Sequence, residues 1–166
     1  MIQKKICMVG ADGVGKTSLV RRYVESVFSE RYHSTLGVKV DKKVVKTGGR
    51  EVSLILWDLA GMNQLSSGPG SYLRGASGYL LVIDGTRHAT LEVAVGLQSD
   101  VQRELGDVPF LVLLNKADLS AQWQLGDGDR ELADRGWTWQ QTSAKLGDGV
   151  EGAFLRLAEQ MLGPLP

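Results

Sequence analysis

The chain of 166 residues has no net charge, a single cysteine and no long apolar run. Its 19 lysines and arginines balance 19 aspartates and glutamates, so it lacks the basic surplus expected of a protein that binds nucleic acid or an anionic membrane. The longest apolar runs have the length of a strand and are too short to cross a bilayer. No long apolar stretch follows the charged start, so we expect no secretory signal.

Cys7 is the one cysteine, and it lies within an apolar stretch that is predicted to be a strand. A single thiol excludes an internal disulfide and suits a reducing cytoplasm, which is the compartment we expect. A nucleophilic role is the alternative, but the sequence places nothing nearby that would activate the thiol. The chain also ends without a cysteine of the kind that is prenylated, so we expect no stable membrane anchor in this chain.

The length suits one domain, residues 1–166, in which apolar strand-like segments alternate with helical ones. This order predicts an α/β fold with a mostly parallel six-stranded sheet, one antiparallel strand and about five helices. The turn Thr47–Arg50 should close the antiparallel hairpin. The predicted strands are Lys4–Val9, Val38–Lys46, Val52–Trp57, Gly78–Asp84, Phe110–Asn115 and Thr138–Thr142. The predicted helices are Lys16–Glu25, Gln64–Leu73, Leu91–Leu105, Asp127–Arg135 and Val150–Leu162.

A glycine-rich segment, Gly10-Ala11-Asp12-Gly13-Val14-Gly15-Lys16-Thr17, follows the first predicted strand and fits G-x-x-x-x-G-K-[ST]. Glycines let backbone N–H groups turn inward around a phosphate, where a Cβ would block the approach. Lys16 supplies a charge to the outer phosphates, the Thr17 hydroxyl is a ligand for Mg²⁺, and a helix beginning at Lys16 adds its dipole. A glycine turn without a ligand is the alternative, which the strand before and the helix after disfavour. The predicted phosphate-binding residues are Asp12, Gly13, Val14, Gly15, Lys16, Thr17 and Ser18.

The segment Asn115-Lys116-Ala117-Asp118 lies at the carboxyl end of a predicted parallel strand, where open α/β sheets bind their ligands. The Asp118 carboxylate accepts two hydrogen bonds, and guanine offers two adjacent donors, its ring N–H and its exocyclic amine. Adenine presents an acceptor on that edge, and sites of this kind discriminate by about 10⁴–10⁵. Taken alone, the segment is equally a loop with a helix cap at Asp118. Together with the phosphate loop it predicts a guanine nucleotide, GTP or GDP.

Two further segments point to Mg²⁺ and the γ-phosphate, although each is a weak signal alone. The sequence Trp57-Asp58-Leu59-Ala60-Gly61 ends a predicted strand, so that Asp58 holds Mg²⁺ through water and the Gly61 N–H reaches the γ-phosphate. Thr35 offers a hydroxyl between two predicted strands, and by itself it is an ordinary loop residue. The predicted metal ligands are therefore Thr17, Thr35 and Asp58.

These motifs occur in one order over nearly the whole chain and resemble those of Ras-superfamily small GTPases. Ser34–Val38 resembles the first switch of the Rab branch, and Trp57-Asp58 resembles both the Rab and Rho branches. The composition, rich in glycine, alanine and arginine, resembles prokaryotic Ras-like members. The resemblance implies a P-loop NTPase three-layer sandwich, a cycle of GTP and GDP with Mg²⁺, and two switch loops that the γ-phosphate orders. It also implies a cytoplasmic monomer that meets an effector, an exchange factor and an activating protein at these loops.

The resemblance implies site residues that spacing alone does not identify. Thr142-Ser143-Ala144-Lys145 resembles the last guanine-binding loop, in which the Ala144 N–H meets the guanine carbonyl, and Phe28 matches the aromatic residue that packs on the guanine edge. The residues implied at the hydrolytic centre are Lys16, Thr35, Gly61 and Met62. The base contacts implied are Phe28, Asn115, Lys116, Asp118, Ser143, Ala144 and Lys145.

Met62 departs from the family, whose members usually have a glutamine there to orient the attacking water. Methionine offers this water no donor and no strong acceptor, so we expect slow hydrolysis unless Gln64 takes the role. Asp12 stands where Ras-like members often have glycine or another small residue, and its carboxylate lies either near the γ-phosphate or in solvent. These departures leave a second hypothesis open, a pseudo-GTPase that holds nucleotide as an interaction module. A P-loop kinase of small metabolites is a third hypothesis, which Asn115–Asp118 disfavours.

Overall fold

The computed structural model describes residues 2–24, 32–33, 38–59, 70–126 and 128–164. Within these ranges one seven-stranded sheet has the order β2-β3-β4-β1-β5-β6-β7. Its strands are β1 (Ile2–Gly10), β2 (Tyr32–His33), β3 (Val38–Thr47), β4 (Arg50–Leu59), β5 (Gly78–Asp84), β6 (Phe110–Asn115) and β7 (Trp139–Gln141). The helices are α1 (Lys16–Val24), α2 (Gly70–Leu73), α3 (Ala89–Leu105), α4 (Gly128–Asp134) and α5 (Val150–Leu162), with a 3₁₀ segment η1 (Ala117–Gln122).

The sheet is mostly parallel, and β3 is the long strand that runs against its neighbour β4. Thr47 and Arg50 pair across the end of this hairpin, and the φ angles of Gly48 and Gly49 between them are 59° and 76°. Glycine adopts such angles without strain, so the predicted turn closes the hairpin as expected. The six predicted strands and the one antiparallel strand among them are confirmed. The two residues of β2 add a short pairing with β3 that the sequence pattern did not indicate.

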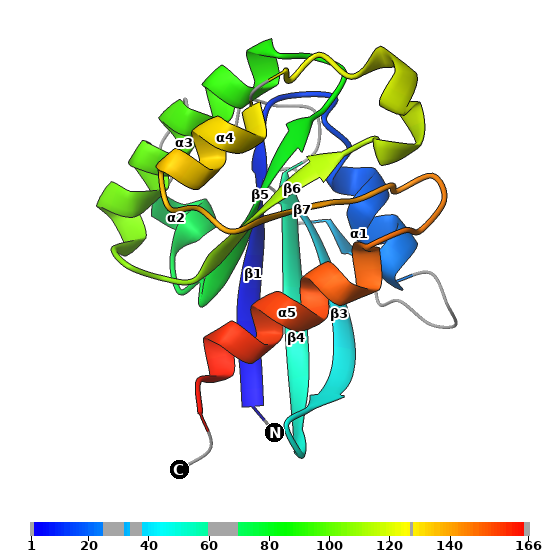
Figure 1. The fold of residues 1–166 in the computed structure, drawn as a ribbon. Coiled ribbons are helices and arrows are strands. Elements are labelled where there is room, and N and C mark those ends of the chain that lie inside the picture. Colours follow the sequence, from blue (N-terminus) through cyan, green and yellow to red (C-terminus); the bar gives the residue numbers. More distant parts are fainter. Residues whose placement is uncertain (1, 25–31, 34–37, 60–69, 127, 165–166) are drawn as a thin grey trace.

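Helices cover both faces of the sheet and give the molecule three layers (Figure 1). On one face Leu19 of α1 and Phe154 of α5 belong to an apolar core with residues of β1, β4, β5 and β6. On the other face Tyr72 of α2, Leu91 of α3 and Leu132 of α4 belong to a second core. The central strand β5 is buried along its whole length, as a parallel strand covered on both sides should be. The predicted three-layer α/β sandwich is therefore confirmed.

Several predicted element bounds are wrong by one or two residues. The helix expected from Leu91 begins at Ala89, and the strand expected over Thr138–Thr142 is limited to the three residues of β7. The last turns of helices and the last pairs of strands have few hydrogen bonds, so local patterns do not fix their ends. The helix expected over Gln64–Leu73 is described only from Gly70 onward, as the four-residue α2. The 3₁₀ segment η1 was not predicted.

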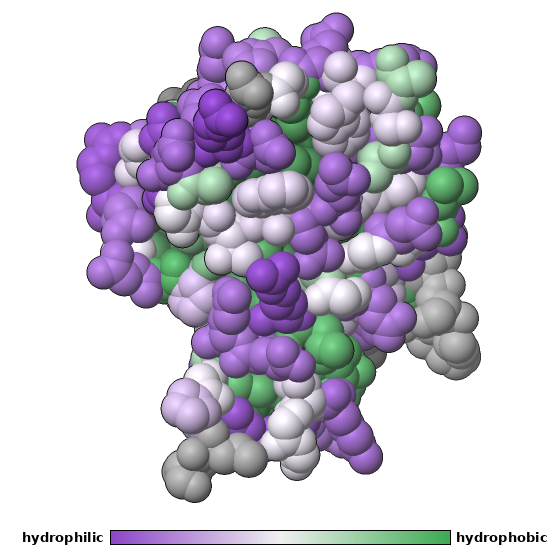
Figure 2. Space-filling view, viewed as in Figure 1, coloured by the Kyte–Doolittle hydropathy of each residue, from purple (hydrophilic) through white to green (hydrophobic). Residues whose placement is uncertain are grey.

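The surface is mainly polar on the face that Figure 2 presents, with small, separate apolar areas. Among the described residues the large apolar side chains that are exposed lie on four separate parts of the chain, and they are Ile2, Val44, Val93 and Leu146. No helix within the described ranges combines the length and apolar character needed to cross a membrane.

Candidate functional site

The predicted motifs meet at the carboxyl ends of the parallel strands, the upper end of the sheet in Figure 1. The glycine-rich loop follows β1, Asp58 lies near the end of β4, and Asn115 ends β6. Asp84 ends β5 and lies opposite Asn115 in the register of the two strands. Ligands of open α/β sheets bind along this edge, so segments far apart in the sequence form one candidate site.

The loop Gly10–Thr17 has a backbone shape that depends on its glycines. The φ angles of Gly13 and Gly15 are 76° and 102°, which other residues rarely adopt. A Cβ on Gly10 would lie 2.5 Å from the Val82 carbonyl oxygen, and one on Gly15 would overlap the Asn115 side-chain amide. The loop therefore packs directly on the ends of β5 and β6 and leads into α1. This arrangement suits a backbone that surrounds an anion with N–H groups.

The Lys16 side chain is buried beneath this loop and reaches back to its first residues. Its Nζ donates to the Gly10 carbonyl at 2.6 Å and to the Ala11 carbonyl at 3.3 Å. Burial lowers the pKa of the ammonium group, and the nearby carboxylates of Asp58 and Asp12 oppose that shift. A cation held in this way is placed to meet the outer phosphates of a nucleotide.

Thr17 and Asp58, two of the predicted metal ligands, are in contact. Thr17 Oγ1 donates to Asp58 Oδ2 at 2.5 Å, and Asp58 is 1% exposed. Asp58 Oδ1 is buried and has no hydrogen-bond partner among the residues that the structure describes. A buried carboxylate oxygen is costly unless a cation or water meets it, and Mg²⁺ prefers oxygen ligands. The pair therefore fits Mg²⁺.

The structure brings together no group of three or more His, Cys, Asp or Glu residues in its described ranges that would hold a metal by themselves. Mg²⁺ in nucleotide sites usually takes one or two protein oxygens and completes its shell with waters and phosphates. A site built from Thr17 and Asp58 has this character, so the donor set suits a metal that arrives with a nucleotide.

Asn115 links three segments through its buried side-chain amide. Its Nδ2 donates to the Val14 carbonyl at 2.9 Å, while its Oδ1 accepts from Thr142 Oγ1 at 3.0 Å and from the Ala144 N–H at 3.3 Å. Asn115 is 1% exposed, so these bonds are shielded from water. Asn115 thus fastens the phosphate loop to the loop after β7.

Asp118 and Ser143 lie together beside Asn115. Asp118 Oδ1 accepts from Ser143 Oγ at 2.8 Å, and Ser143 Oγ accepts from the Leu146 N–H at 3.0 Å. Lys116, between Asn115 and Asp118, has a φ of 70° and is the one non-glycine residue with a positive φ in the described ranges. Such backbone strain is typical of functional sites. The segment is held in a fixed shape from both sides.

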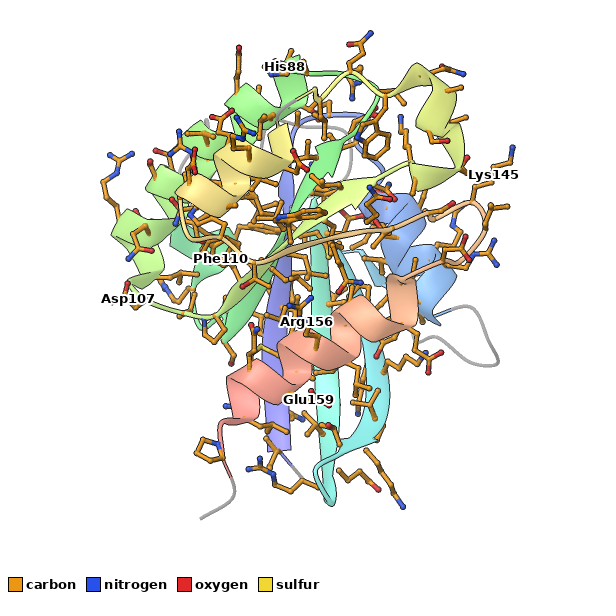
Figure 3. The ribbon with its side chains drawn as sticks, in the orientation of Figure 1. His88, Asp107, Phe110, Lys145, Arg156 and Glu159 are labelled. Carbon is orange, nitrogen blue, oxygen red and sulfur yellow. The ribbon has the colours of Figure 1, made fainter. Side chains whose placement is uncertain are left out.

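The remaining predicted residues divide into exposed ones and ones outside the described ranges. Asp12 and Ser18 are exposed. Lys145 is exposed and lies at the periphery on the loop after β7 (Figure 3). Four predicted residues, and Gln64 with them, lie outside the described residues: Phe28, Thr35, Gly61 and Met62.

Sequence reasoning missed three residues at this site. Asp84 Oδ2 accepts from Lys116 Nζ at 2.8 Å and from Arg87 Nε at 3.0 Å. Arg22 of α1 donates from Nε to the Ala144 carbonyl at 2.9 Å and from Nη2 to the Lys145 carbonyl. Asp84 ends an apolar strand at the same edge as Asn115, which is a signal that could have identified it. Nothing in the local sequence marks Arg22 or Arg87.

The chain is similar to proteins of one family over nearly its whole length. A family model with the description "Ras family" matches residues 5–163. The chain is 33% identical over 165 residues to the Ras-related protein Rab-10 of Caenorhabditis elegans, covering 98% of this chain and 82% of that protein. It is 33% identical over 165 residues to Rab-4B of Homo sapiens, covering 97% and 77%. The matched region contains every motif described above.

Proposed function

Because the chain belongs to the Ras family and is Rab-like, we propose that residues 1–166 form one G domain that binds GTP and GDP with Mg²⁺ at the site described above. As a family member it is a GTP-binding switch of the trafficking or signalling type and a GTP hydrolase. The observation that carries the proposal is the meeting of the phosphate loop, Asp58 and Asn115–Asp118 at one sheet edge. Nothing in the comparisons or in the described residues favours the pseudo-GTPase alternative.

The phosphate end of the nucleotide is assigned to the loop after β1. Lys16 brings its charge to the outer phosphates, and the N–H groups around Gly13 and Gly15 surround them. Thr17 and Asp58 hold Mg²⁺, which when bound neutralises charge on the phosphates. The other residues assigned to this end are Asp12, Val14 and Ser18.

The guanine end is assigned to the segments after β6 and β7. Asp118 accepts from the ring N–H and the exocyclic amine of guanine, and Ser143 holds its carboxylate in place. Ala144 donates its N–H to the guanine carbonyl, beside the Asn115 amide that orients this loop. The other residues assigned to this end are Phe28, Lys116 and Lys145.

Hydrolysis is assigned to four residues, Lys16, Thr35, Gly61 and Met62. Lys16 stabilises its charge, and Thr35 and the Gly61 N–H contact it when GTP is bound. Met62 leaves the attacking water without an orienting partner, so turnover is slow; Gln64 is the first substitute to test. Thr35 also completes the Mg²⁺ ligands. The exchange of GDP for GTP orders the segments around Thr35 and Gly61, and this change is what a partner reads.

Family members work with effectors, exchange factors and activating proteins. We place such partners at the switch segments of a monomeric chain that does not bind nucleic acid. The cytoplasm is the proposed compartment. Its support is Cys7, whose buried thiol has a pKa that burial raises to about 12 and which therefore stays protonated.

A competition assay with fluorescent GDP tests this function. Unlabelled GTP and GDP should displace the probe in the presence of Mg²⁺, whereas ATP at the same concentration should not. Asp118→Ala removes charge-assisted hydrogen bonds and should weaken GDP binding by more than about a hundredfold. Asp134→Ala, an exposed aspartate of α4, is the matched control and should bind as the parent does. Displacement by ATP at concentrations similar to GTP would overturn the assignment.

A further inference from the structure

Asp84, at the carboxyl end of β5, is a fully buried carboxylate outside the predicted motifs. Its Oδ1 accepts from the N–H and the hydroxyl of Thr86 at 2.8 and 2.6 Å. Its Oδ2 accepts from Lys116 Nζ at 2.8 Å and from Arg87 Nε at 3.0 Å. Two cations from different loops therefore meet at one oxygen of a buried anion.

Arg87 extends this contact to the phosphate loop. Its Nη2 donates to the Asp12 carbonyl at 2.8 Å, and a Cβ on Gly13 would lie 3.2 Å from the same nitrogen. The planar guanidinium thus contacts Asp84 through its Nε and the loop backbone through its Nη2. Lysine has one ammonium and cannot reproduce both contacts in this fixed geometry. His88, the next residue in the chain, is labelled at the upper end of Figure 3.

The loop that carries Arg87 is itself held firmly. The Gly85 N–H donates to the Asn115 carbonyl at 3.0 Å, and the Gly85 carbonyl accepts from the Gln124 N–H at 2.8 Å. The Trp123 ring occupies the place that a Cβ on Gly85 would take. Arg87 therefore projects from a fixed base, although its side chain is 48% exposed. A half-exposed arginine contributes little to the packing of a core. We therefore expect its side chain to matter mainly through its hydrogen bond to the phosphate loop.

We propose that Arg87 is a positioning residue for the phosphate loop, and that Asp84 couples this loop to the base-recognition segment through Lys116. The continuous series of contacts runs from Asp12 through Arg87 and Asp84 to Lys116. The phosphate loop and the base segment are thereby held as one unit. Removing the Arg87 side chain frees the phosphate loop alone, whereas removing the Asp84 charge frees both segments. This inference rests on the proposed binding of guanine nucleotides at the site.

The test compares the release of fluorescent GDP and fluorescent inosine diphosphate, each with Mg²⁺, from the parent, from variants of Arg87 and Asp84, and from a control variant. Inosine lacks the exocyclic amine, so the ratio of the two release rates reports how well the base segment is held. Arg87→Ala should speed the release of both nucleotides by about tenfold, because one half-exposed charged contact to the loop is lost. The release-rate ratio should stay at the parent value, since Lys116 keeps its contact with Asp84. The release rates of Arg87→Lys should lie between those of the parent and those of Arg87→Ala.

Asp84→Asn removes the anion that both cations share, so it should speed release and also bring the release-rate ratio closer to one. Arg103→Ala, an exposed arginine of α3 paired with Asp100, is the matched control and should release GDP at the parent rate. If Asp84→Asn does not fold, the double variant of Arg87→Ala with Lys116→Ala tests the coupling. The change in its GDP release rate relative to the parent should then differ by threefold or more from the product of the changes in the two single variants.

Release of GDP from Arg87→Ala at the parent rate would overturn the inference and leave the proposed function standing, because the parent binds GDP in the same assay. An unchanged release-rate ratio in Asp84→Asn, or independent effects in the double variant, would overturn the coupling. A parent that binds neither nucleotide would overturn the proposed function and the inference with it.

Discussion

Replacing Asn115 by alanine removes the side chain that joins the phosphate loop to the loop after β7. The amide is 1% exposed and makes hydrogen bonds to the Val14 carbonyl, the Thr142 hydroxyl and the Ala144 N–H. Two of these bonds are buried and one is partly buried, so water cannot fully replace the lost partner. The substitution should therefore both destabilise the fold and loosen the nucleotide.

The magnitude follows from the number of bonds. A net contribution of about 1 kcal/mol for each gives a loss of about 3 kcal/mol for Asn115→Ala. Thr142→Val keeps the shape of its buried side chain and removes a single bond, so it should cost about 1 kcal/mol. If the same contacts hold the nucleotide-bound loops, a loss of 3 kcal/mol raises the rate of GDP release by about a hundredfold.

Urea denaturation measures the first effect, and release of fluorescent GDP measures the second. Both variants and the parent should be compared at one concentration of GDP and Mg²⁺, because a ligand that binds only the folded state adds to its stability. The denaturant slope should be unchanged, so that shifts in the midpoint report stability alone. If Asn115→Ala costs no more than Thr142→Val, other contacts hold the loops and the reasoning is refuted.

Three further predictions concern single residues. The hydrogen bonds to Asp84 outweigh its burial and lower its pKa from 3.8 to about 2, so Asp84→Asn should lose about 2 kcal/mol of unfolding free energy above pH 4. The difference in unfolding free energy between parent and variant should disappear as the pH falls from 4 to 2, and a difference that stays constant in denaturation series would contradict this. Burial raises the pKa of Cys7 to about 12, so mass spectrometry should find it unmodified by iodoacetamide at pH 8 in the folded chain and labelled in urea; labelling at equal rates would refute its burial. Single-turnover phosphate release should be at or below about 10⁻⁴ s⁻¹ for the parent, the order of intrinsic Ras hydrolysis, and faster for Met62→Gln. Hydrolysis by the parent within seconds would instead mean that another residue orients the attacking water, and Gln64 would be the first residue to mutate.

The sequence predicted those parts of the site that are contiguous in the chain. The phosphate loop and Asn115–Asp118 each carry a pattern whose chemistry is local, and the alternation of strands and helices placed both at one edge of the sheet. The sequence assigned Thr17 and Asp58 to one metal, and the structure places these two side chains in contact. These predictions needed only the order of the elements and not their detailed packing.

The parts that could not be predicted depend on register and side-chain reach. Asp84 meets Arg87 and Lys116 only because β5 and β6 pair in one particular register, with Asp84 opposite Asn115. Arg22 reaches the loop after β7 only through the packing of α1 near α5. The two-residue strand β2 gives too short a pattern to be recognised in the sequence.

The central claim is that this chain holds a guanine nucleotide, and the most direct test identifies the nucleotide bound to the purified protein. Acid release followed by chromatography, after incubation with equal concentrations of GDP, GTP, ADP and ATP in Mg²⁺, gives its identity and amount. The account predicts guanine nucleotide at about one per chain, as expected for one site. Adenine nucleotide in the same fraction, or no nucleotide at all, would contradict it.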